Sequence, residues 1–156
     1  MRTADELPFK PLNLPRAPLN ISYTGGVYHV FDIFRKKKIV LTPEEWVRQH
    51  LLHFLISDMK YPKSMFKVES GLLYNKMQKR TDILCYDRNA NPFLLIECKS
   101  PSVAIKPGVL EQLSAYNQKI KALYISVSNG LVHYVYKIDY DQKSYQSLTA
   151  FPTYHL

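Results

Sequence analysis

Cysteine is scarce in this sequence. The 156 residues contain only two, Cys85 and Cys98. Two thiols cannot build a disulfide framework or a four-ligand zinc site, and the five histidines show no metal-ligand spacing with them. We therefore interpret both cysteines as reduced, packed thiols, which is the usual state in cytosolic proteins.

Long hydrophobic runs are missing as well. No apolar stretch approaches the roughly 18 residues that a membrane-spanning helix needs. The N-terminal residues Met1 to Glu6 are not followed by the apolar segment of a signal peptide. These absences predict a cytoplasmic protein without a membrane partner.

Negative charge is in deficit. Thirteen Asp and Glu residues stand against 21 Lys and Arg residues, which gives a formal net charge of +8 and an isoelectric point near 9.4. This excess favours a polyanionic partner such as nucleic acid, although many basic proteins bind none. The hydrophobic share of 46% and the length suit one folded domain and leave no room for a motor domain.

Residues 1–26 form a proline-rich N-terminal arm, and residues 27–156 form the expected domain. Prolines in this arm remove backbone donors and bias their neighbours to extended conformations, so no helix is expected there. Residues 27–41 alternate β-branched and aromatic side chains around the basic run Arg35 to Lys38, which predicts a hairpin with a charged tip. Such a tip is usually a solvated turn, and a contact to phosphate is the alternative.

A helix is expected to begin after Thr42, an N-cap residue that is followed by a first-turn proline. The spacing of Val47 and Leu51, continued by later apolar residues, defines one buried stripe, and the helix should end before Tyr61. Glu44 precedes Val47 by three residues and falls on that stripe. A carboxylate in line with a buried face is costly unless something binds it, so Glu44 is a site candidate; the alternative is a residue that only interacts with the helix dipole.

Later segments alternate between strand and helix patterns. This alternation predicts an α/β or α+β fold with one central sheet. The segments 82–86 and 93–99 flank turn residues and should pair as an antiparallel hairpin. The remaining expected elements are a strand at 66–74 interrupted at Ser70 and Gly71, a helix at 109–120, strands at 123–127 and 131–136, and an edge strand near Tyr145.

Charged residues occur at unusual places in the apolar hairpin. Asp82 opens its first strand, while Glu97 and Lys99 close the second and point to the same face. The hairpin would bring the two carboxylates and the ammonium group together. Mg²⁺ prefers oxygen ligands, which Asp82, Glu97 and the backbone carbonyl of Cys98 could supply, so hydrolysis of phosphodiesters is the implied reaction. The alternative is a strand-capping Asp82 beside a solvent-facing ion pair of Glu97 and Lys99.

Several segments together resemble the PD-(D/E)xK nuclease superfamily, and within it the N-terminal nuclease domain of type I restriction enzyme R subunits. The resemblance covers roughly residues 35–135 and implies a restriction-endonuclease-like fold, a mixed central sheet flanked by helices. Any single match would be weak, but the six occur in order at compatible spacing. They are residues 41–49, 61–64, 80–83, 95–101, 112–117 and 128–130.

The resemblance also implies roles for individual residues. Asp82 and Glu97 would be metal ligands for Mg²⁺ or Mn²⁺, and Lys99 the catalytic lysine. A carboxylate on the first helix would lie near the metal, with Glu44 preferred and Glu45 not excluded. By the same resemblance, Gln112 and Tyr116 would support the active site. The candidates for contact with nucleic acid, on the basis of their charge, are Arg80, Lys36, Lys37 and Lys38.

Two other functions remain open on the sequence alone. The chain could be a nucleic-acid-binding or assembly module that keeps the fold and does not cut. It could also be a nuclease for RNA or structured DNA, because Asp82, Glu97 and Lys99 would act on the phosphate and would not distinguish the base or the sugar. Expected partners are DNA and proteins of a restriction or defence system. A homodimer is a further possibility, since double-strand cutting by so small a domain would need two copies.

Overall fold

The computed structural model describes residues 7–74 and 77–154, with side chains outside residues 69–81. Within these residues the helices and strands follow closely the order expected from the sequence. The elements are β1 (Ile21–Thr24), β2 (Val27–Asp32), β3 (Lys37–Val40), α1 (Pro43–His53), a π-helical turn (Phe54–Asp58), a 3-10 turn (Lys63–Met65), β4 (Phe66–Tyr74), β5 (Met77–Tyr86), β6 (Pro92–Cys98), α2 (Pro107–Ile120), β7 (Tyr124–Ser128), β8 (His133–Asp139) and β9 (Ser144–Leu148).

The strands of the described residues form two sheets, a three-stranded one of order β1-β2-β3 and a six-stranded one of order β4-β5-β6-β7-β8-β9. Only β6 and β7 run parallel, because α2 crosses over between them; the other neighbours are antiparallel. The mixed fold and the hairpin of β5 and β6 are confirmed. The interruption expected at Ser70 and Gly71 is wrong, since β4 runs through both residues.

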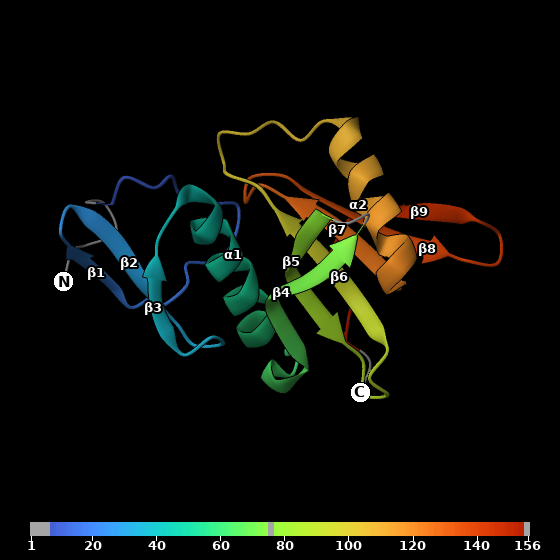
Figure 1. The fold of residues 1–156 in the computed structure, drawn as a ribbon, viewed down its shortest axis with the longest axis horizontal. Helices are drawn as coiled ribbons and strands as arrows, with labels where there is room; N and C mark the ends of the chain where they lie inside the picture. Colours follow the sequence, from blue (N-terminus) through green and yellow to red (C-terminus); the bar gives the residue numbers. More distant parts are fainter. Residues whose placement is uncertain (1–6, 75–76, 155–156) are drawn as a thin grey trace.

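Helix α1 lies between the two sheets, and α2 covers the opposite face of the larger sheet (Figure 1). One side of α1 places Val47 and Leu51 against Ile83 and Ile96 of β5 and β6. Its other side places Trp46 against Val30 of the small sheet. Helix α1 is therefore buried almost all round, which a single apolar stripe in the sequence did not indicate.

The N-terminal arm packs on this core without a helix, as its prolines predicted. Leu12 contacts two of the core clusters. The backbone carbonyl of Lys10 accepts a hydrogen bond from Trp46 Nε1 at 3.0 Å, and Asn13 N donates to the carbonyl of Gly130 at 2.8 Å. Strand β1 lies within the expected arm and pairs with β2, so the arm and the domain share a sheet.

Gly130 is required by this arrangement. Its φ angle is +83°, and a Cβ atom there would lie 2.7 Å from Leu12 Cδ2. Gly130→Ala should therefore lower the free energy of unfolding by about 1 to 3 kcal/mol, through backbone strain and a clash with the arm. Gly108→Ala is the matched control, because Gly108 lies in α2 with no atom near its Cβ position. Urea unfolding should show the control unchanged or more stable, and equal loss in both variants would contradict the prediction.

No helix of residues 7–74 and 77–154 is long and apolar enough to cross a membrane.

Candidate active site

Strands β5 and β6 bring the predicted carboxylates together near the C-terminal end of β6. Ile83 pairs with Ile96, so the next pair along this antiparallel ladder is Asp82 and Glu97. Asp82 is an interior residue of β5, which begins at Met77, so the expectation that Asp82 opens its strand is wrong; Glu97 is the next-to-last residue of β6. Lys99 follows two residues later, with its Nζ 3.4 Å from Glu97 Oε1. The three side chains form one cluster.

Asp82 is held at both of its carboxylate oxygens. Its Oδ2 accepts a hydrogen bond from the backbone N–H of Cys98 at 2.8 Å, and its Oδ1 lies 2.6 Å from Nη2 of Arg48. The Asp82 and Glu97 side chains are 15% and 16% exposed and that of Lys99 is 30% exposed. The cluster is thus ordered by the protein and still open to a substrate.

Helix α1 contributes its first turn to the same place. Arg48 Nη2 lies 3.4 Å from Glu44 Oε1, and the Glu44 side chain is 47% exposed. Glu45 is the buried residue of the pair, with its side chain 5% exposed between Arg35 and Arg48. The expectation that Glu44 lies on the buried stripe is therefore wrong. The small sheet covers the Glu45 side of α1, and Glu44 faces the open cluster.

The charges of these groups interact. Burial raises the pKa of Glu44, and the negative charges of Asp82 and Glu97 raise it further, while Arg48 and Lys99 partly oppose the shift. Each of these residues is therefore close enough to influence Glu44. The concentration of carboxylates in this cluster favours a cation there.

Arg48 is the site residue that the sequence patterns did not reveal. Its side chain is 5% exposed and also contacts Glu45 Oε2 through Nη1 at 2.5 Å. Despite the cost of burial, the neighbouring carboxylates raise the pKa of Arg48, so it stays charged. The available signal was its spacing, since Arg48 follows Glu44 and Glu45 by four and three residues on one helix.

The ion pairs continue away from the cluster to the small sheet. Glu45 also pairs with Arg35, and Arg35 Nη2 lies 2.6 Å from Oδ2 of the fully buried Asp32. Asp32 accepts further hydrogen bonds from the backbone N–H groups of Phe34 and Arg35 and from the side chain of Gln49. Although burial alone would raise the pKa of Asp32, these hydrogen bonds and the charge of Arg35 lower it.

The lowered pKa of Asp32 predicts a pH-dependent contribution to stability. A carboxyl group with a depressed folded-state pKa stabilises above its unfolded pKa, and the contribution disappears as the pH falls through the folded value. Asp32→Asn should therefore cost about 3 kcal/mol near neutral pH, and the deficit should shrink as the pH falls from about 4 towards the lower folded pKa. Urea unfolding of both proteins across this range is the measurement. A deficit independent of pH would show that shape, not charge, holds the turn.

The donors at this site suit a hard divalent cation only in part. Among the side chains that the structure describes, those of residues 7–68 and 82–154, no three from His, Cys, Asp or Glu gather in a geometry that would hold a metal by themselves. Mg²⁺ commonly uses one or two carboxylates and completes its shell with waters and substrate oxygens. Asp82, Glu97 and the carbonyl of Cys98 fit that smaller requirement, provided that Oδ1 of Asp82 exchanges Arg48 for the metal.

The remaining candidates lie in different settings. Gln112 is exposed on α2, whereas Tyr116 is buried under the same helix against Leu84 and Leu95, and burial raises its pKa. The side chain of Arg80 lies outside the described residues. Lys36, Lys37 and Lys38 are exposed, but Lys37 and Lys38 are successive residues of β3 and face opposite sides of the small sheet.

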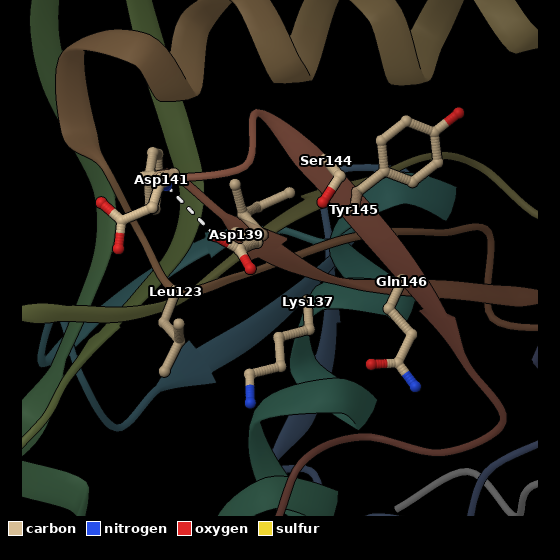
Figure 2. A pocket seen from close by; sticks show the side chains of 9 residues that line it. Leu123, Lys137, Asp139, Asp141, Ser144, Tyr145 and Gln146 are labelled. Atoms are coloured by element: carbon tan, nitrogen blue, oxygen red, sulfur yellow. Dashed lines mark hydrogen bonds between the residues drawn. The ribbon is translucent and has the colours of Figure 1, made fainter.

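A separate concavity of about 430 Å³ lies along the β8-β9 hairpin (Figure 2). Asp139 and Asp141 line it together with Lys137. The Asp139 carboxylate, however, accepts hydrogen bonds from the backbone N–H groups of Asp141 and Gln142. These carboxylates thus belong to a hairpin turn and not to the cluster around Asp82.

A known protein family covers most of this sequence. The model of the family described as type I restriction enzyme R protein N terminus matches residues 43–152, which is more than half of the chain. The chain belongs to this family. The matched segment contains the complete cluster of Glu44, Arg48, Asp82, Glu97 and Lys99, together with the whole six-stranded sheet.

A larger protein of known structure also matches part of the chain. A solved fragment of an HsdR subunit of a type I restriction enzyme from Vibrio vulnificus YJ016 is 24% identical, with a TM-score of 0.37. The match covers 57% of this chain and 17% of that one. No curated protein matches the sequence.

Proposed function

We propose that the chain is a metal-dependent DNA endonuclease domain that hydrolyses phosphodiester bonds in a restriction or defence system. The observation that carries this proposal is the convergence of Asp82 from β5 with Glu97 and Lys99 from the end of β6, with Glu44 beside them. Family membership supports the link to restriction, and the charge of +8 supports an anionic substrate.

The chain's own residues would divide the work. Asp82 and Glu97, with the Cys98 carbonyl, would hold Mg²⁺ or Mn²⁺, which when bound lowers the pKa of a water and offsets charge on the phosphate. Arg48 and the Cys98 N–H keep the Asp82 carboxylate in place. Lys99, which is partly exposed beside Glu97, would orient the attacking water or stabilise developing negative charge.

The experiment that tests this function is a cleavage assay with linear, circular and single-stranded DNA and an RNA control. The purified protein is incubated with Mg²⁺, with Mn²⁺ or with EDTA. We expect cutting of DNA that requires a divalent ion and that stops in EDTA. Preferential cutting of RNA, or of single-stranded DNA, would redirect the proposal to the corresponding substrate.

One observation favours a second function. Both oxygens of Asp82 already have protein donors, and Arg48 supplies a buried positive charge next to the carboxylates. A nucleic-acid-binding or assembly module could keep this arrangement without a metal. Salt-sensitive DNA binding without cleavage under any metal condition, in the presence of candidate partner proteins as well, would support that module.

A further inference from the structure

A basic pocket lies outside the acidic cluster, between the β2-β3 turn and the start of β4. Its volume is about 480 Å³. Arg35 and Lys36 line it from the turn, Lys63 and Ser64 line it from the 3-10 segment, and Phe34 and Phe66 contribute apolar walls. No acidic residue is among the described side chains that line it.

The net positive charge of the pocket comes from its two lysines. The Arg35 guanidinium pairs with Asp32 and Glu45, so its charge is largely balanced inside the protein. Lys36 and Lys63 are exposed. Two ammonium groups and the hydroxyl of Ser64 would suit an anion whose oxygens accept several hydrogen bonds, such as a phosphate.

The turn that presents Lys36 is held from below. Asp32 accepts hydrogen bonds from the backbone N–H groups of Phe34 and Arg35 at 2.7 and 2.8 Å. At the tip of the turn, Lys36 adopts a φ angle of +53°. The Phe34 ring packs on Phe66 with centroids 5.8 Å apart, and Lys63 Nζ lies 5.7 Å from the Phe34 centroid. The two lysines are thus carried by an ordered frame rather than by a loose loop.

The frame is connected to the acidic cluster. Arg35 pairs with Glu45, Glu45 pairs with Arg48, and Arg48 pairs with Asp82. Arg35 of the pocket and Asp82 of the cluster thus contact side chains of the same helix, α1, and a polymer with regularly spaced phosphates could engage both places. A short anion could occupy only one of them.

We propose that this pocket binds a backbone phosphate of the DNA strand on which the acidic cluster acts, at a distance from the bond that is cut. The proposal rests on the proposed function for the identity of the polymer. The pocket would fix the register of the DNA, since phosphate contacts position a nucleic acid without reading its sequence.

The test compares two pairs of charge-removing substitutions with equal change in net charge. Lys36→Gln with Lys63→Gln removes the pocket lysines. Lys143→Gln with Lys119→Gln is the control. Lys143 has a φ angle of +51°, a positive value like that of Lys36, and Lys119 is exposed on α2. Binding of a labelled DNA duplex is measured as a function of salt concentration in EDTA, where no cutting occurs. Thermal unfolding verifies that each variant folds. Lys63→Gln alone is tested as a second variant.

We expect the pocket variant to lose roughly tenfold in affinity and to lower the salt slope by about one, for the one phosphate contact removed, while the control keeps the slope of the unaltered protein. An unchanged slope in the pocket variant, or an equal loss in the control, would overturn the proposal. The proposal would also be overturned if inorganic phosphate stabilised the unaltered protein but not the pocket variant while both proteins bound DNA equally well. The pocket would then be a site for free phosphate.

The same data separate this proposal from the proposed nuclease. Metal-dependent cutting with an inert lysine pair would leave the nuclease in place and remove the phosphate pocket. A pocket-specific loss of DNA binding in a protein that never cuts would leave the pocket in place and remove the nuclease.

Discussion

Glu97→Gln is expected to reduce DNA cleavage by at least about a thousandfold. The substitution preserves the size of a side chain at the end of β6 and removes the charge that a divalent ion would need. Metal binding, followed by the rise in thermal unfolding temperature on addition of Mn²⁺, should weaken in parallel.

Lys99→Met should give a different pattern, because the lysine is not a ligand. Cleavage should be lost to a similar degree while the stabilisation by Mn²⁺ remains. If Lys99→Met instead unfolds the protein, its contact with Glu97 at 3.4 Å is a structural ion pair, and the catalytic role is wrong.

Asp141→Asn provides the matched control for both variants. Asp141 is exposed and lies in the β8-β9 turn, where it lines the concavity drawn in Figure 2, whereas the acidic cluster is carried by β5, β6 and α1. Its neutralisation should leave cleavage and metal binding unchanged. Retained cleavage in Glu97→Gln would exclude the metal site proposed at Asp82 and Glu97.

Arg48→Met should produce the largest loss of stability, about 3 to 5 kcal/mol in the free energy of unfolding. Arg48 is buried against Glu45 and Asp82. Removal of its positive charge leaves these two largely desolvated carboxylates without that partner. Arg35 still pairs with Glu45, which limits the loss. Urea unfolding at neutral pH in EDTA measures the effect without a contribution from metal.

A double-mutant cycle with Glu45→Gln separates charge from packing. If the buried pair is the cause, the double variant should lose less stability than the sum of the two single variants. Strict additivity would show that the aliphatic stem of Arg48, and not its charge, supports α1. Lys119→Met on the exposed side of α2 should be within about 0.5 kcal/mol of the unaltered protein.

Local patterns in the sequence predicted most of the elements and the main carboxylate cluster. Alternation in strands and the turn at residues 87–92 are set by neighbouring residues, so the β5-β6 hairpin and the approach of Asp82 to Glu97 could be inferred from the sequence alone. Thr42 and Pro43 marked the start of α1 for the same reason, and the structure shows Thr42 Oγ1 accepting the N–H of Glu45.

Burial of α1 could not be inferred in this way. An amphipathic pattern reports one apolar face, but α1 has a second partner, because the arm and the strands β1 to β3 pack on its other side. That packing buries Glu45 and Arg48 and leaves Glu44 exposed, contrary to the simple stripe.

The meeting of Asp82, Glu97 and Lys99 across the β5-β6 hairpin therefore follows from residue types, turn chemistry and strand alternation, all of which can be read along the chain. Three-dimensional packing selects Glu44 as the glutamate of α1 that joins them, pairs Arg48 with Asp82, and places Lys36 and Lys63 around one pocket. The two kinds of feature differ because strand pairing within a hairpin is a local property, whereas ion pairs between distant segments depend on how the two sheets enclose α1.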